Sequence, residues 1–266
     1  MKKYSLAIIG CGKLSQIVAD AWLSGLLPDY QIAGAYSRTY ETTQRFVEKL
    51  NDRVPGSESK ACKSMDELLD LKADFIVEAA APAVVREWAI PALQKGSSLV
   101  ILSIGALADV EFYKEVKDAA SENGERVHLV SGSIGGFDVL RTVSLMEDSK
   151  VSFDTEKGPD SLKNTSVYRD ALQSEKQVVF KGNAAEAIAL FPTKVNVAVA
   201  ASLATNGPEN IDVSITSTPG YVGDRHRISV ESEQVNALVD IYSKTSEIAG
   251  WSVVHTLRNI TSPIVF

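Results

Sequence analysis

The sequence has few of the features that mark secreted, membrane or nucleic-acid-binding proteins. Its 266 residues include two cysteines, Cys11 and Cys62, and Cys11 stands inside a Gly-x-Gly turn, where a disulfide is not expected. The formal net charge is −7, and no block of basic residues is available to neutralise nucleic-acid phosphates. No apolar run reaches the roughly 18 residues that cross a bilayer, and no signal-peptide cleavage pattern follows the N-terminus. We therefore expect a cytoplasmic protein with free thiols that binds neither nucleic acid nor membranes.

The composition is typical of a globular protein with one large domain or two ordinary ones. Hydrophobic residues account for 45% of the chain and charged residues for 23%. A chain of this length buries a full core without disulfides. Disorder, collagen-like repeats and coiled coil are thereby disfavoured, and we predict no metal site.

The first half of the sequence alternates short apolar runs with segments of helical periodicity. Strands are predicted at residues 4–9, 31–36, 73–79, 98–103 and 126–130. Helices are predicted at 13–26, from 39 to about 50, after the cap Ser64, from Pro82, and at 109–123. This alternation predicts an α/β fold in which residues 1–130 form a doubly wound parallel sheet with right-handed crossovers.

The second half has a different pattern. Residues 150–155, 176–181, 210–217 and 227–233 alternate with period two, which predicts strands of a more antiparallel sheet. Helices are predicted near 135–145, 184–204 and 234–249. We therefore predict a second, α+β domain at 131–235 for substrate binding and dimerisation, and a C-terminal segment, 236–266, that packs back on the first domain.

A glycine-rich turn separates the first predicted strand from the first helix. It consists of Gly10, Cys11, Gly12, Lys13, Leu14 and Ser15. The first glycine permits a tight turn, the second lets the backbone approach a pyrophosphate, and the helix N-terminus supplies N–H donors. Ser15 replaces the usual third glycine. In this strand–turn–helix context the motif predicts a Rossmann dinucleotide-binding domain; a purely structural turn is the alternative.

The end of the second predicted strand bears on the choice of cofactor. An acidic residue there would bind the ribose 2′-hydroxyl of NAD, but the sequence has Ser37, Arg38 and Thr39. Because Arg38 can pair with a 2′-phosphate, we predict that NADP is used at least as well as NAD. The alternative is that Arg38 stacks on the adenine, which suits both cofactors.

Small residues follow the next two strands of the predicted sheet. Ala80 and Ala81 come after the strand at 73–79, and Ser103 ends the strand at 98–103. The carboxyl ends of parallel strands face the ligand crevice, so these residues leave room for ribose and nicotinamide. Ordinary tight turns are the alternative interpretation.

Four later segments carry a family resemblance. They are residues 131–138, 191–197, 223–228 and 259–263. Together with the glycine turn, they resemble the L-aspartate dehydrogenase family in order and spacing over nearly the whole chain. The resemblance implies a Rossmann domain followed by an α/β domain whose sheet helps to form a homodimer. It also implies NAD(P)-dependent oxidative deamination of L-aspartate to iminoaspartate, and the reverse amination of oxaloacetate with ammonia.

The resemblance also assigns site residues. The family's Asn-x-His pattern, which carries its acid/base histidine, falls on Asp224-Arg225-His226. Its Gly-Ala-Ile-Gly-Gly loop near the nicotinamide falls on residues 132–136, with Ser133 for Ala. Its Phe-Pro-x-Asn-x-Asn segment falls on 191–196, with Lys194 for the first Asn and Asn196 retained. A terminal Asn-Pro-Lys-Thr-Ser segment falls, partly preserved, on 259–262. The departures at Lys194 and Asp224 put the substrate in doubt more than the reaction class.

The residues themselves support a proton-transfer role for one histidine. Hydride transfer at a carbon bearing nitrogen or oxygen needs a proton donor or acceptor at that heteroatom, and histidine suits this task near neutral pH. His128 and His255 lie in apolar surroundings and are interpreted as structural. His226 stands among charged residues beside Asp224, whose carboxylate would raise the histidine pKa. A packing or surface histidine is the alternative.

Lys194 has three interpretations. It can bind a substrate carboxylate as a point charge, donate a proton if burial lowers its pKa, or be a solvated lysine. A carboxylate substrate would also accept hydrogen bonds from Ser133, the backbone at 135–136, Thr261 and Ser262.

Three functions remain in competition. The first is an NAD(P)-dependent dehydrogenase acting on the CH–NH₂ group of aspartate, with His226 and Lys194 as catalytic residues. The second is a reductase of another oxo or imino acid on the same scaffold. The third is a protein that senses NAD(P) without turnover. The enzyme hypothesis requires the His226 imidazole to lie at the mouth of the nucleotide crevice.

Overall fold

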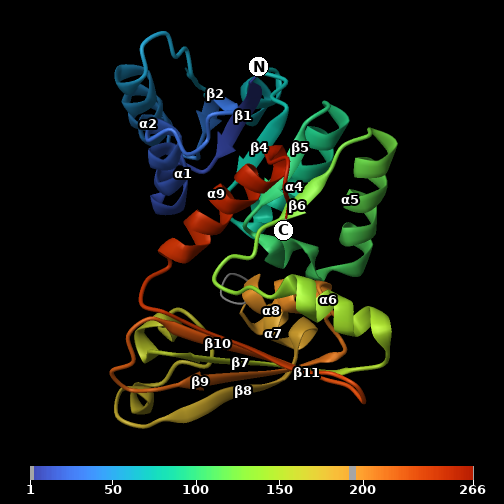
Figure 1. Ribbon diagram of the computed structural model, residues 1–266. Coiled ribbons are helices and arrows are strands. Elements are labelled where there is room, and N and C mark those ends of the chain that lie inside the picture. The colour runs from blue at the N-terminus through green and yellow to red at the C-terminus, as the bar shows by residue number, and fades with distance from the viewer. Residues whose placement is uncertain (1–2, 192–195, 266) are drawn as a thin grey trace. The chain divides into compact units, whose positions relative to one another are not determined.

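The computed structural model describes residues 3–191 and 196–265, and the chain divides into two compact units (Figure 1). Unit 1 runs from the N-terminus to Val130 and resumes at Ala249. Unit 2 is the intervening segment, Ser131–Ile248. The functions predicted for the domains at 1–130, 131–235 and 236–266 stay predictions, since these units are compact bodies and not tested functional parts.

In the described part of unit 1, six parallel strands form one sheet in the order β3-β2-β1-β4-β5-β6. The strands are β1 (Tyr4–Ile9), β2 (Tyr30–Tyr36), β3 (Lys60–Ala61), β4 (Phe75–Glu78), β5 (Ser98–Ile101) and β6 (Val127–Leu129). The predicted parallel α/β sheet is thus confirmed. The two-residue β3 was not predicted, because so short a strand has no periodicity to recognise.

Helices alternate with these strands. They are α1 (Lys13–Leu23), α2 (Tyr40–Arg53), α3 (Met65–Leu69), α4 (Pro82–Gln94) and α5 (Val110–Glu122), with a 3-10 turn, η1 (Ile104–Ala108), before α5. Local sequence explains several starts. The Ser64 hydroxyl accepts the Glu67 N–H at 3.2 Å, and the Asp109 carboxylate accepts two N–H groups of the first turn of α5. Pro82 occupies the first position of α4, as predicted.

The last helix, α9 (Glu247–Thr261), completes the core of unit 1. Val253 and Leu257 are fully buried in the same cluster as the strand residues Ile8 and Val77. The Tyr30 hydroxyl donates to the Leu257 carbonyl at 2.8 Å. The strands are apolar throughout because helices cover both faces of a parallel sheet.

In the described part of unit 2, five strands form a mixed sheet in the order β11-β10-β7-β9-β8. The strands are β7 (Lys150–Lys157), β8 (Gln177–Asn183), β9 (Ile211–Ser217), β10 (Asp224–Glu231) and β11 (Asn236–Ser243). The β7–β9 pair is parallel and the other three pairs are antiparallel. Two 3-10 turns, η2 (Pro159–Leu162) and η3 (Asp170–Gln173), lie between β7 and β8. The predicted α+β character with a more antiparallel sheet is confirmed.

One face of this sheet packs against α6 (Phe137–Met146), α7 (Ala184–Leu190) and α8 (Asn196–Leu203), as Figure 1 shows. Along each strand, side chains that face these helices alternate with side chains on the opposite face. In β7 the helix-facing residues are Val151, Phe153, Thr155 and Lys157, which are all buried. This alternation is the period-two pattern of a sheet with one covered face.

Three predicted elements were wrong. Residues 234–249 do not form a helix, because residues 236–243 pair with β10 as β11, with burial that alternates along the strand; the helix begins at Glu247. The helix predicted at 184–204 is interrupted, with α7 ending at Leu190. The strand predicted from 227 begins at Asp224, so that His226 lies inside β10 and not before it.

None of the helices formed by residues 3–191 and 196–265 is long and apolar enough to cross a membrane.

Candidate functional site

The glycine turn closes the carboxyl end of β1. Gly10 has φ +90°, and a Cβ at this position would lie 2.6 Å from the Ala79 carbonyl oxygen. The Gly10 N–H donates to the Tyr36 carbonyl at 2.8 Å. Gly10 is therefore required by both its backbone conformation and the close approach of the β4 end.

Gly12 differs from Gly10, because a Cβ there would meet no atom within 4 Å. Gly12 is the N-cap of α1, and no side chain caps that helix. Lys13 and Leu14 are its first two residues. Because nothing inside the chain requires a glycine at this position, the open backbone fits the close approach of a ligand phosphate to a helix N-terminus.

Two side chains of the turn, those of Ser15 and Cys11, face the protein interior. Ser15 is fully buried and its hydroxyl donates to the Gly10 carbonyl, so it takes the place of the third glycine without disturbing the turn. Cys11 is also buried, and burial raises the pKa of its thiol. Any contact of Cys11 with a cofactor therefore involves its backbone.

The three residues after β2 are Ser37, whose hydroxyl is bonded within the protein, and the exposed residues Arg38 and Thr39. The Ser37 hydroxyl donates to the Thr39 carbonyl at 3.0 Å and lies 2.9 Å from the Thr43 hydroxyl. Thr39 is the N-cap of α2, although its side chain makes no capping hydrogen bond. Arg38 is exposed. Of the predicted ribose-binding residues, Arg38 and Thr39 are thus both exposed, and Arg38 is the one that carries a charge.

Glu78 is a residue whose importance the sequence analysis missed. It ends β4 and is 3% exposed. Its carboxylate accepts hydrogen bonds from the N–H groups of Ala80 and Ala81 at 2.7 and 3.0 Å. It also accepts the N–H and the hydroxyl of Ser103 at 3.0 and 2.8 Å. The predicted residues Ala80, Ala81 and Ser103 are therefore brought together around one buried carboxylate, and burial raises its pKa against these four hydrogen bonds. The available signal was an acidic residue at the end of an otherwise apolar strand.

In unit 2, His226 is buried on the helix-covered face of β10. Its ring is 3% exposed, stacks on the Phe153 ring at 5.7 Å, and places Nδ1 3.0 Å from the Thr155 hydroxyl. The nearness of Asp224 in the sequence predicts a raised pKa for His226. The structure reverses that expectation: burial and the nearby Lys157 ammonium lower the pKa of His226 to about 4, and Asp224 only partly opposes them. The imidazole is therefore neutral at pH 7.

Lys157 is a second residue that the sequence analysis missed. It lies opposite Asp224 in the β7–β10 pairing, and its side chain is 9% exposed. Its Nζ lies 3.6 Å from an Asp224 carboxylate oxygen. The signal was the alternation of β7, which places Lys157 on the same face as Phe153 and Thr155; the strand had been predicted to end before Lys157.

The remaining predicted residues of unit 2 lie in turns and helix starts. Ser133 is half-buried in the loop before α6, in which Gly132 and Gly136 have positive φ angles. Asn196 is the first residue of α8. Lys194 lies outside the described residues, so its three interpretations stay predictions.

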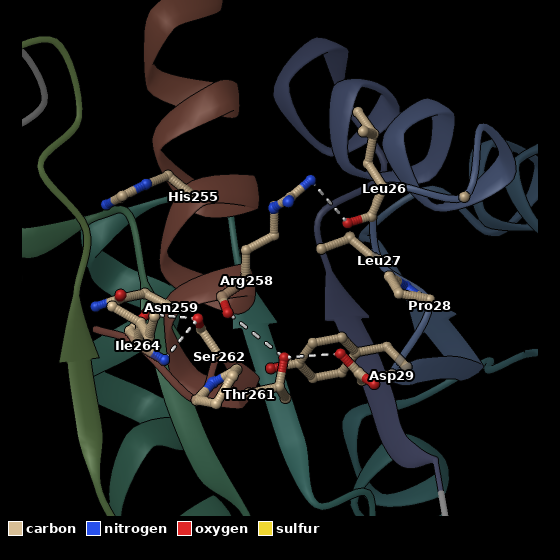
Figure 2. A pocket seen from close by; sticks show the side chains of 13 residues that line it. Leu26, Leu27, Pro28, Asp29, His255, Arg258, Asn259, Thr261, Ser262 and Ile264 are labelled. Carbon is tan, nitrogen blue, oxygen red and sulfur yellow. Dashed lines mark hydrogen bonds between the residues drawn. The ribbon is translucent and has the colours of Figure 1, made fainter. Parts of the chain in front are cut away.

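The segment at 259–262 is not at the nucleotide edge of unit 1. Together with His255, Arg258 and residues 25–30, it lines a cavity of about 460 Å³ (Figure 2). This cavity adjoins Tyr30, where β2 begins, whereas the glycine turn contacts Tyr36, where β2 ends. The Thr261 hydroxyl donates to the Asp29 carboxylate at 3.1 Å. The expectation that Thr261 and Ser262 bind substrate with the nicotinamide-site residues is therefore not supported.

The letters Lys-Thr-Ser of the family's terminal segment also occur at Lys244-Thr245-Ser246, directly before α9. A Cβ on Gly223, whose φ is +82°, would lie within 3 Å of both the Ser243 carbonyl and the Lys244 Cα. This segment thus lies beside the turn that leads into Asp224.

A parallel sheet with a glycine turn and an uncapped helix N-terminus after its first strand defines a Rossmann dinucleotide-binding protein. A family model described as "Homoserine dehydrogenase, NAD binding domain" matches residues 10–130. A second, "Aspartate dehydrogenase, C-terminal", matches residues 138–260. The chain therefore combines a nicotinamide-dinucleotide domain with the C-terminal part of an aspartate dehydrogenase.

Whole-chain relatives agree. The chain is 31% identical to an L-aspartate dehydrogenase of Methanocella arvoryzae, with 98% of each chain covered. It is 29% identical to one of Methanococcus maripaludis over 97% of each chain. The crystal structure of aspartate dehydrogenase from Thermotoga maritima matches with a TM-score of 0.73 and 26% identity over 99% of each chain. The chain belongs to the L-aspartate dehydrogenase family.

Proposed function

We propose that this protein is an NAD(P)-dependent dehydrogenase that oxidises L-aspartate to iminoaspartate, which gives oxaloacetate and ammonia, and that also catalyses the reverse amination. The observation that carries the proposal is the buried imidazole of His226, positioned by Thr155 and stacked on Phe153, in a chain with an open dinucleotide turn. A base that is neutral at pH 7 can accept a proton from the substrate ammonium group.

His226 is the proposed catalytic base. In the tautomer in which Nδ1–H donates to the Thr155 hydroxyl, Nε2 would present a lone pair to the substrate nitrogen. In the amination direction the same nitrogen returns the proton. The stacked Phe153 ring restricts the orientation of the imidazole and excludes water from its face.

The glycine turn, the β4 end and the β5 end are proposed to bind the cofactor. The backbone from Gly10 to Leu14 would receive the pyrophosphate, with Gly12 giving the space. Ala80, Ala81 and Ser103, oriented by Glu78, would line the ribose and nicotinamide end. Ser133 and Asn196 are also proposed as cofactor-binding residues. When bound, the nicotinamide supplies the hydride acceptor or donor.

We further propose that NADP is used at least as well as NAD. The exposed Arg38 can pair with a 2′-phosphate, and no carboxylate follows β2 directly to bind a 2′-hydroxyl. The ratio of kcat/KM for the two cofactors tests this proposal. A clear preference for NAD would contradict it.

A homodimer and a cytoplasmic location are also proposed. The uncovered face of the unit 2 sheet exposes Val178, Leu238 and Tyr242, together with Arg225 and Arg227 paired to Asp240. Apolar side chains rimmed by charges are typical of a protein interface. The two cysteines are free and buried, as expected in a reducing compartment. Sedimentation equilibrium tests the dimer.

Initial rates with a panel of oxo acids, each with and without ammonia and with either cofactor, test the function. We expect ammonia-dependent oxidation of NAD(P)H with oxaloacetate and the reverse reaction with L-aspartate. Faster turnover of another oxo acid would favour the alternative function, a reductase of another oxo or imino acid, which the residues Asp224 and Lys194 suggest. Tight NAD(P)H binding without turnover of any acid would favour a sensor.

A further inference from the structure

The helix-covered face of the unit 2 sheet is apolar except at one end. There, polar residues occupy neighbouring positions on three strands: Lys157 lies opposite Asp224 on β10 and beside Ser217 on β9. Two residues along each strand, Thr155 lies opposite His226. Farther along, the face continues with apolar residues such as Phe153 and Ile228.

The positive charge of Lys157 is only partly compensated within the protein. A buried ammonium group is costly unless it is paired and hydrogen-bonded. Among the described residues its ion pair is with Asp224, at 3.6 Å, which is longer than a direct N–H···O hydrogen bond. The Asp224 side chain is 41% exposed, so part of its charge is solvated. The ammonium group thus retains capacity for another anion.

Ser217 adds an independent observation. It is 0% exposed, and its hydroxyl has no hydrogen-bond partner among the described residues. Buried hydroxyls are nearly always hydrogen-bonded. An unpartnered hydroxyl at the position beside a buried ammonium group marks a place where a ligand oxygen would satisfy both.

We propose that Lys157 and Ser217 bind one carboxylate of the substrate, and that Asp224 is the counter-ion of Lys157 that this carboxylate displaces. This proposal rests on the proposed function, whose substrate has two carboxylates and reacts beside His226. Lys157 lies two strand positions from the residue paired with His226, or about 7 Å at the usual rise. A four-carbon dicarboxylate is of comparable length. The cluster thereby selects dicarboxylic over monocarboxylic acids.

Equilibrium binding of succinate to the protein saturated with NAD(P)H tests the subsite without requiring turnover. We expect Lys157→Met to weaken binding about 10- to 100-fold, as expected for a lost charge-assisted hydrogen bond, and Ser217→Ala to weaken it several-fold. Asp224→Asn should tighten binding, because the competing carboxylate is gone. Lys176→Met is the matched control, since Lys176 pairs with Glu156 but is 61% exposed. It should leave binding unchanged.

Kinetics with L-aspartate and L-alanine provide a second measurement. Lys157→Met should raise the KM for aspartate much more than the KM for alanine, which has no second carboxylate. Unchanged succinate affinity in both Lys157→Met and Ser217→Ala, or no succinate binding by the wild type, would overturn the subsite. If Lys157→Met does not fold, as judged by circular dichroism, Ser217→Ala and Asp224→Asn decide by the same criteria.

The two proposals fail separately. A wild-type protein that oxidises aspartate while its Lys157→Met variant is unimpaired retains the proposed function and loses the subsite. A protein that does not oxidise aspartate, but binds succinate in a Lys157-dependent manner, retains the subsite and loses the function.

Discussion

Unit 1 and unit 2 each bury an ionisable side chain beside predicted binding residues, but they supply it with different numbers of partners. In unit 1, the Glu78 carboxylate accepts four hydrogen bonds from Ala80, Ala81 and Ser103. In unit 2, Lys157 has a carboxylate at 3.6 Å, and the Ser217 hydroxyl beside it has no partner among the described residues. A buried ionisable group whose hydrogen bonds are all made within the protein needs no ligand for its stability. A buried group that lacks partners can gain them from a bound ligand.

The largest expected effect separates the chemical step from cofactor binding. His226→Asn removes the proposed base, and we expect turnover to fall by about 10²- to 10⁴-fold, the usual contribution of general acid–base catalysis. The affinity for NAD(P)H, measured by fluorescence titration, should change little because the glycine turn belongs to unit 1. Near-wild-type turnover would remove His226 from the mechanism.

Two glycine variants distinguish a structural role of Gly10 from a cofactor-binding role of Gly12 in unit 1. Gly10→Ala places a Cβ against the Ala79 carbonyl at φ +90°, so it should lower the free energy of unfolding by about 1–3 kcal/mol or more. Gly12→Ala meets no atom of the chain, so it should change stability by less than about 1 kcal/mol. It should instead weaken NAD(P)H binding about 10- to 100-fold. Denaturant unfolding and cofactor titration measure the two quantities. Equal effects of both variants on stability would contradict this division.

The completeness of the Glu78 network is tested by Glu78→Gln. The amide leaves at least one N–H donor without an acceptor, which should lower the free energy of unfolding by roughly 1–3 kcal/mol and weaken cofactor binding. Glu87→Gln, at an exposed position of α4, is the control and should have almost no effect. A Glu78→Gln variant as stable as the control would show that the four hydrogen bonds contribute little.

The smallest effects concern pH. If neutral His226 is the active form, kcat/KM for aspartate oxidation should fall on the acid side with an apparent pKa near 4, and not near 6.5. Removing the Lys157 charge should raise this pKa, and Asp224→Asn should lower it. Because the folded-state pKa is depressed, the stability that depends on neutral His226 should be lost as pH falls from about 6.5 to about 4. Shifts of the same sign in the two variants would contradict the assigned charges.

The sequence predicted unit 1 better than unit 2 for a physical reason. Its signals are local in the sequence: strands that are apolar throughout, the glycine turn at Gly10, and the helix caps at Ser64 and Asp109. They identified the parallel sheet and the nucleotide edge. The buried partners of Glu78 come from a different strand and from a turn, so no local pattern could reveal them.

In unit 2 the errors came from short elements with ambiguous periodicity. The segment from Asn236 to Ser243 is a strand because it finds β10 as a partner, and such long-range pairing is not visible in the segment itself. Lys157 could not be identified from the sequence for the same reason. Its proposed role depends on Asp224 of β10 and Ser217 of β9, which strand pairing places beside it. The pKa of His226 was expected to rise from its acidic neighbour, whereas burial decides its direction.

The return of the chain to unit 1 after Ile248 has a consequence for biosynthesis. The cluster that includes Ile8 and Val77 also contains Val253, Val254 and Leu257, so the core of unit 1 is complete only after the last helix has been synthesised. The intervening segment, Ser131–Ile248, has all its strands earlier and can fold while translation continues. A nascent chain stalled before Ala249 would therefore present unsatisfied apolar surface to chaperones and proteases, although most of its codons had already been read.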